Sequence, residues 1–498
     1  MDASLIEGMG KELDEFLGEF DDCFGRSEPR KHLRTYVRGQ LSDLQRKSVE
    51  PIALAGDVPP RTLQEFLNAV KWDERRMRDR LQHIVARQHA DPRAIGVIDE
   101  TGNPKKGRHT AGVHRQWCGR TGNVDNCVVA VHLGYVVGDF QCLLDSDLFL
   151  PEEWVDDLVR RAEAKIPPEV VFRTKLEIAL AQVQRALANG IRVAAWTFDS
   201  FYGRSGAFLD GMGASGQNYV GEIPSNFCGW LRAPRVLSSP RPQELGRRGK
   251  RWKYPRVSRK TSHVCEVQSL CERSPVFRQQ AWQRFRIKDG EKGPMVWEVK
   301  YSLFYRKHGP DGLPGPAHTL IMARNVLNPE EVKYFLANMA VGCGGVTLEW
   351  LLWVAFSRWP IERCFQVGKS ELGMDHFEVR SWAGIHRHLY ISQLSQLLCA
   401  RIHQQLREKN DREFVSDRGA DSHSGFSVGR SPVPAALGSY HDLPEGRRAD
   451  RLLPDSQPAG SHVPYEDDTP TPPGYGHPGR PTAVLCAGGS MNLGVVTK

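Results

Sequence analysis

Apolar positions in residues 1–90 recur at the three- and four-residue spacing of amphipathic helices. In segment 75–88 they keep this spacing among densely placed arginines, at Met77, Leu81, Ile84 and Val85. The pattern predicts an N-terminal helical domain over 1–90. A small arginine-rich helical domain suits DNA binding, although a helical subdomain packed against the next domain would show the same pattern.

A different pattern begins at residue 91 and continues to 205. Two short apolar runs end in carboxylates, AIGVIDE with Asp99 and IRVAAWTFDS with Asp199, and a long helical pattern over 172–190 lies between them. A further strand is predicted over 126–137. Strand, helix and strand with acidic ends predict an α/β domain whose site lies at the edge of the sheet, where both carboxylates terminate their strands.

The pattern alternates and is rich in turns from 206 to 325, which predicts a β-rich insertion. Residues 326–410 return to helical periodicity, with a helix starting at Asn328-Pro329 and two more over 347–368 and 388–409. Proline, glycine and serine then dominate, so 411–498 is predicted to be a disordered tail.

Composition narrows the class of protein. The chain has 498 residues, 40% of them hydrophobic, enough for about two to four domains. No apolar run approaches the roughly 20 residues of a membrane span, and the acidic N-terminus MDASLIEGMGKELDEF differs from a secretory signal. The 11 cysteines show no repeated close pairing. We therefore expect a cytoplasmic protein without a membrane partner.

Basic residues cluster within the insertion although the net charge is only +8. The stretch RRGKRWKYPRVSRK combines cations that neutralise phosphates with flat rings that stack on bases. It is either a nucleic-acid contact or a solvated loop. The candidate DNA-binding residues in it are Arg247, Arg248, Lys250, Arg251, Trp252, Lys253 and Tyr254.

The segment RWPIERCFQVGKSELGM places Arg358, Glu362 and Lys369 on one helical face, since residues four and seven apart lie close together on a helix. Alone, this triplet would be a surface ion-pair ladder. Together with Asp99 and Asp199, however, Glu362 completes a set of three carboxylates.

Three carboxylates are the oxygen ligands that Mg²⁺ or Mn²⁺ prefers, and two such ions could catalyse displacement at phosphorus. Basic side chains would then bind phosphates rather than act as acid or base. The candidates are Lys105, Lys106, Arg358 and Lys369.

Three segments, GVIDETGNPKKGRHTAGVHRQWCGRTGNVDNCVVAV, WTFDSFYGR and RWPIERCFQVGKSELGMDHFEVRSW, resemble bacterial insertion-sequence transposases of the DDE type, in the insertion-sequence 701 family of the family-4 group. The resemblance implies a ribonuclease-H-like catalytic core, a β-rich insertion before the last acidic residue, and Asp99, Asp199 and Glu362 as metal ligands. Ala355 stands where the wider group has a tyrosine.

The resulting hypothesis is that the protein is a transposase. It would cleave DNA at the ends of its element and join the 3′-hydroxyl to target DNA, using two Mg²⁺ or Mn²⁺ ions. Its partners would be element-end repeats, target DNA and a second copy in a homodimer, within the bacterial cytoplasm at the nucleoid. One alternative is an inactive or repurposed transposase that only binds DNA. A glycosidase with paired carboxylates would leave the basic residues without a role.

Overall fold

The computed structural model describes residues 3–237, 254–258, 263–290, 293–309 and 312–418. Contacts divide the chain into units 1–442 and 443–498, and all described residues lie in the first.

The N-terminal segment is helical, as the sequence predicts. Its apolar stripes meet in a core where the rings of Phe24, Phe66 and Trp72 pack against one another. The helices are α1 (Ala3–Gly18), α2 (Ser27–Leu41), α3 (Val49–Ala55), α4 (Pro60–Asn68) and α5 (Glu74–Gln88).

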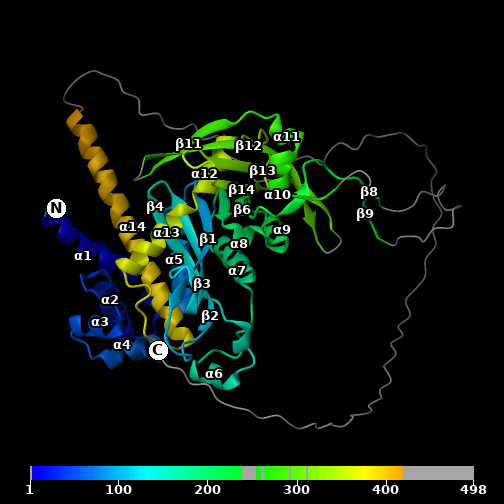
Figure 1. The fold of residues 1–498 in the computed structure, drawn as a ribbon. Helices are drawn as coiled ribbons and strands as arrows, with labels where there is room; N and C mark the ends of the chain where they lie inside the picture. Colours follow the sequence, from blue (N-terminus) through cyan, green and yellow to red (C-terminus); the bar gives the residue numbers. More distant parts are fainter. Residues whose placement is uncertain (1–2, 238–253, 259–262, 291–292, 310–311, 419–498) are drawn as a thin grey trace, which may run out of the picture. The chain divides into compact units, whose positions relative to one another are not determined.

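A mixed sheet follows the helices (Figure 1). Five of its strands run in the order β4-β3-β1-β5-β6, with β3 antiparallel to both β1 and β4, and β5 parallel to both β1 and β6. The strand bounds, including the hairpin strand β2, are β1 (Ile95–Pro104), β2 (His114–Cys118), β3 (Asn123–Val137), β4 (Phe140–Leu148), β5 (Ala195–Phe198) and β6 (Tyr219–Ile223).

Helix α7 (Lys175–Ala188) confirms the helix predicted over 172–190. A capping box between Thr174 and Glu177 satisfies free amides of its first turn and fixes where the helix begins. Its buried face packs on β3 and β4. Shorter helices flank it, namely α6 (Leu158–Glu163), α8 (Ser200–Gly203) and α9 (Gly206–Ala214).

The predicted insertion is β-rich and extends the same sheet (Figure 1). Beyond β6 the strand order is β14-β13-β12-β7-β10, while β11 pairs with β12, and β8 and β9 form a separate small sheet. The elements are β7 (Cys228–Trp230), β8 (Val236–Leu237), β9 (Arg256–Val257), β10 (Cys265–Glu266), α10 (Val267–Arg273), α11 (Pro275–Arg278), β11 (Gln283–Gly290), β12 (Gly293–His308), β13 (Leu313–Asn325) and β14 (Val332–Ala337).

The prediction that a helix starts at Asn328-Pro329 is wrong. Those residues form a turn, and β14 follows, paired antiparallel with β13 on one side and with β6 on the other. The Asn-Pro-Glu-Glu pattern matches a helix start, but hydrogen bonding to two neighbouring strands overrides that local signal.

The helical region predicted over 347–368 is two helices, α12 (Leu348–Phe356) and α13 (Trp359–Ser370). Ser357 caps the end of α12, and Pro360 occupies the first turn of α13, where its missing N–H leaves no intrahelical bond unmade. The last helix, α14 (Trp382–Arg418), confirms the helix predicted over 388–409 and runs past the predicted start of the tail. Residues 419–498 of that tail lie outside the described residues.

Helix α14 lies along β4 and joins the N-terminal helices to the sheet (Figure 1). The Tyr36 hydroxyl of α2 lies 2.9 Å from Nδ1 of His388, and the Gln40 amide donates to Ser392 at 2.8 Å. These polar pairs are buried, so they fix the register of α2 against α14.

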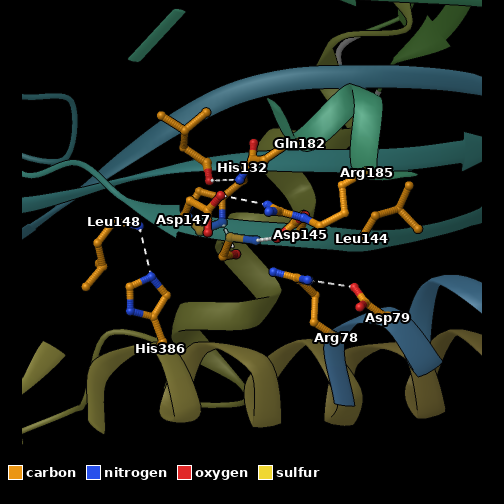
Figure 2. A network of polar contacts seen from close by, with 12 residues as sticks. Arg78, Asp79, His132, Leu144, Asp145, Asp147, Leu148, Gln182, Arg185 and His386 are labelled. Atoms are coloured by element: carbon orange, nitrogen blue, oxygen red, sulfur yellow. Dashed lines mark hydrogen bonds and ion pairs between the residues drawn. The ribbon is translucent and has the colours of Figure 1, made fainter. Parts of the chain in front are cut away.

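A second buried polar network links α5, β4 and α7 (Figure 2). Arg185 of α7 forms 2.7 Å ion pairs with both Asp145 and Asp147 of β4. From α5, Gln82 donates to the Asp145 carboxylate, and Arg78 pairs with Asp79 beside it. Charges this deeply buried are stable only when paired, so the network fixes how these elements pack.

Candidate active site

The register of two parallel strands places Asp99 and Asp199 side by side. Strands β1 and β5 pair as far as Ile98 opposite Phe198, and each aspartate is the next residue. Asp199 follows the end of β5, as predicted. Asp99 instead lies in the middle of β1, because β1 continues beside β3 after β5 has left the sheet. The prediction that Asp99 ends its strand is therefore wrong.

Asp199 is held by the first turn of α8. Its carboxylate accepts hydrogen bonds from the N–H groups of Phe201 at 3.0 Å and Tyr202 at 3.4 Å. An aspartate at this N-cap position satisfies amides that have no partner within the helix. The orientation of the carboxylate is therefore set by the backbone.

Glu362 reaches the site from α13. Ile361 and Phe365 of this helix are buried, while the Glu362 side chain is 49% exposed. The buried residues thus anchor α13 to the core, and the helix presents Glu362 on its exposed face.

Arg358 lies between the carboxylates of two different elements. Its guanidinium is 2.8 Å from Asp99 Oδ2 and 2.9 Å from Glu362 Oε1. The predicted shared face of Arg358 and Glu362 is confirmed, since this pair spans one helical turn. One cation thus connects β1 to α13.

The carboxylates influence one another electrostatically. Burial raises the pKa of Asp99 to about 7; the charge of Asp199 adds to the rise, whereas Arg358 opposes it. Burial also raises the pKa of Asp199, again against the effect of Arg358. Two buried acids next to one cation favour any further positive charge at this position.

The predicted phosphate-binding lysines have different surroundings. Lys369 Nζ donates to the Thr101 hydroxyl at 2.5 Å, on the same face of β1 as Asp99. Lys105 Nζ donates to the Phe377 carbonyl at 2.7 Å and lies over the Phe377 ring. Burial lowers the pKa of Lys105 to about 8. Lys106 is exposed.

Among the candidate DNA-binding residues of the basic cluster, those from Arg247 to Lys253 lie outside the described residues, and Tyr254 is exposed. Ala355, at the position of the group's tyrosine, is buried in α12.

Glu100 and Tyr202 are site neighbours that sequence reasoning missed. Glu100 points to the opposite face of β1 from Asp99, where its carboxylate pairs with Lys175 at 2.6 Å and accepts from the Tyr202 hydroxyl at 3.2 Å. In the sequence, Glu100 directly follows Asp99, and Tyr202 lies three residues after Asp199. This proximity to the predicted aspartates was the one signal by which the sequence could have indicated them.

Glu222 of β6 was also missed. Its charge acts on both Asp199 and Arg358, and its carboxylate pairs with Lys333 at 3.2 Å. A lone glutamate in the strand sequence YVGEI is the only local signal, and the sequence does not reveal that β6 lies next to β5.

The donor set fits a divalent cation. Among the described residues, no three His, Cys, Asp or Glu side chains are already grouped as metal ligands. Asp99 and Glu362, however, are both ion-paired to the guanidinium on which the charge of Asp199 also acts. Three oxygen donors around one positive charge have the chemistry that Mg²⁺ and Mn²⁺ require.

Comparison with known families identifies the family of this chain. A family model described as DDE superfamily endonuclease matches residues 19–294, more than half of the chain. The chain belongs to the DDE superfamily endonucleases. The matched residues include Asp99 and Asp199, whereas Glu362 lies beyond them. The resemblance to DDE-type enzymes inferred from the motifs is thus confirmed.

One relative carries a more specific name. A probable transposase for insertion sequence element IS701 from Microchaete diplosiphon is 30% identical over 243 residues. The alignment covers 46% of this chain, which spans about 61% of the length of that relative. No helix in the described part of the DDE endonuclease chain combines the length and apolar character that crossing a membrane requires.

Proposed function

We propose that this DDE endonuclease is a transposase, and that Asp99, Asp199 and Glu362 bind the divalent ions it uses. The observation that carries the proposal is that Asp99 of β1 and Glu362 of α13 both pair with Arg358, on which the charge of Asp199 at the end of β5 also acts. The similarity to a probable insertion-sequence transposase supports DNA at element ends as the substrate. Intact acidic residues favour an enzyme over a chain that only binds DNA.

The proposed fold of the catalytic core is ribonuclease-H-like. The strand order β4-β3-β1-β5-β6, with only β3 reversed, supports this assignment. The β-rich segment between Asp199 and Glu362 corresponds to the insertion of the resembling family. On this basis the domains are 1–90, 91–205, 206–325 and 326–410, with DNA binding proposed for the first.

Two Mg²⁺ or Mn²⁺ ions held by these carboxylates would activate an oxygen nucleophile and stabilise the departing oxygen at phosphorus. The residues of the chain supply position and charge. Asp199 is oriented by backbone amides, and Asp99 by the amide of Glu100. We propose that Lys369 and Arg358 bind a phosphate beside the carboxylates, and that Lys106 binds one further along the DNA.

We propose a reaction in two steps. Water attacks a phosphodiester at the element end and frees a 3′-hydroxyl, which then attacks a phosphodiester of the target. Both steps are in-line displacements by oxygen, so one site can serve both. Holding two ends together favours a homodimer, and we propose that the enzyme acts on DNA of the bacterial nucleoid.

The test is nicking and joining of DNA that carries the sequences flanking the gene, with Mg²⁺ or Mn²⁺. Asp99→Asn, Asp199→Asn and Glu362→Gln should each reduce both reactions to the level seen without protein. Asp156→Asn, which alters an exposed aspartate, should retain activity and is the matched control. A wild-type chain that binds this DNA but neither nicks nor joins it would leave only DNA binding.

A further inference from the structure

Arg358 pairs with one oxygen of each of two carboxylates, Asp99 and Glu362, that a metal ion would use. Asp99 accepts from the Glu100 amide at Oδ1 and from Arg358 at Oδ2, so both of its oxygens are engaged. Oε1 of Glu362 pairs with the same guanidinium. A divalent ion approaching Asp99 and Glu362 would therefore meet the positive charge of a guanidinium that is already paired with both carboxylates.

The guanidinium cannot give way by losing its charge. Arginine stays protonated at any pH at which proteins function. Burial alone would lower the pKa of Arg358, but the charges of Asp99 and Glu362 outweigh it and raise the pKa. Only movement of the side chain can free the two carboxylates.

The position of Arg358 in the fold allows such movement. It stands at the break between α12 and α13, one residue before α13 begins, and its side chain is 25% exposed. Its backbone is already helical, and Ile361 donates to its carbonyl. The side chain can therefore turn toward solvent without unwinding α13.

We propose that Arg358 blocks divalent ions from the free protein, and that a DNA phosphate binds the guanidinium and releases Asp99 and Glu362 for the ions. This inference rests on the proposed function. A phosphate can accept two parallel hydrogen bonds from a guanidinium, the same pattern of donors that the carboxylates use. Binding of DNA and binding of metal then favour each other, so the metal site assembles only when substrate is present.

The experiment measures Mn²⁺ binding by the full chain through loss of the free Mn²⁺ signal in electron paramagnetic resonance. Without DNA, Arg358→Gln should bind Mn²⁺ at least about tenfold more tightly than wild type. Arg363→Gln removes the same charge from an exposed position on α13 and should stay within about twofold of wild type. Circular dichroism checks that each variant is folded.

A second arm needs no substitution at Arg358. Duplex DNA with the gene's flanking sequences should tighten Mn²⁺ binding by wild type, after subtraction of the signal from the same DNA with Asp99→Asn. Equal Mn²⁺ affinity with and without DNA, or equal affinity of wild type and Arg358→Gln, overturns the inference.

The two parts of the experiment distinguish failure of the blocking role of Arg358 from failure of the proposed function. If Asp99→Asn abolishes Mn²⁺ binding while Arg358→Gln leaves it unchanged, the metal site stands and the blocking role is wrong. If Asp99→Asn has no effect on Mn²⁺ binding in any background, or no variant binds Mn²⁺, the proposed metal site fails and the inference fails with it.

Discussion

The Tyr202 hydroxyl donates a hydrogen bond to the Glu100 carboxylate, 3.2 Å away, and so joins the two chain segments that carry Asp199 and Asp99. Tyr202 is fully buried, and Glu100 also pairs with Lys175. The bond lies on the face of the sheet opposite Arg358. The segments that carry the two aspartates are thus joined on that face, while on the other face the Asp99 carboxylate pairs with Arg358.

Tyr202→Phe should lower the free energy of unfolding by about 1 kcal/mol, because it removes one buried hydrogen bond and leaves Glu100 paired with Lys175. Denaturant unfolding measures this. Tyr305→Phe removes a hydroxyl that has no hydrogen-bond partner among the described residues and should change stability little. Equal effects of the two substitutions would show that the bond does not contribute.

Arg185→Met should destabilise the fold by about 3–5 kcal/mol, because it leaves Asp145 and Asp147 buried without their shared cation (Figure 2). Equilibrium unfolding in urea is the measurement, and Arg87→Met, at an exposed position of α5, is the control. A loss below about 1 kcal/mol would mean that these buried charges are compensated in another way.

The free energy of unfolding should fall as the pH is lowered from 7 to 5, because His388 is buried. Burial lowers the pKa of His388 to about 4, so the native state keeps it neutral while the unfolded chain binds a proton below about 6.5. The unfolded state therefore binds more protons than the native state. This residue should lower the free energy of unfolding by about 2 kcal/mol between pH 7 and pH 5.

Unfolding of wild type and His388→Gln at pH 7 and pH 5 tests that pH dependence. The variant should lose about 2 kcal/mol less than wild type over this interval. Identical pH dependence would indicate that His388 is protonated in the native state.

Lys106 and Lys105 should differ in their effect on DNA binding. Lys106 is exposed, so Lys106→Ala should reduce the slope of log K against log salt by about 0.9, the value for one phosphate contact. Lys105 is held by the Phe377 carbonyl and ring, so Lys105→Ala should lower the melting temperature and change the slope less. Fluorescence anisotropy at several salt concentrations measures the DNA affinity and hence the slope for each variant. Equal slopes for the two variants would mean that Lys105 and Lys106 contribute equally to DNA binding.

Much of the fold could be predicted because local patterns were unambiguous. The apolar spacing of 75–88 is that of α5, and the runs around Asp99 and Asp199 are those of β1 and β5. The helix expected at Asn328 was wrong because strand pairing on both sides determines β14. Local sequence carries no information about such neighbours.

The three acids of the candidate site were proposed from the sequence, whereas the contacts that support them were not. Spacing of four residues was enough to pair Arg358 with Glu362, but the contact of Arg358 with Asp99 spans 259 residues. The bonds of Arg185 to β4 and of Tyr202 to Glu100 are likewise tertiary. No pattern of period two or 3.6 encodes them, so only the folded chain reveals them.

The most direct test of the shared metal site is an anomalous difference map from crystals of the full chain grown with flanking-sequence DNA and Mn²⁺. The proposal predicts Mn²⁺ peaks bounded by Asp99, Asp199 and Glu362, with Arg358 turned to a phosphate. Mn²⁺ peaks elsewhere, or none while Arg358 stays between Asp99 and Glu362 with DNA bound, would contradict it.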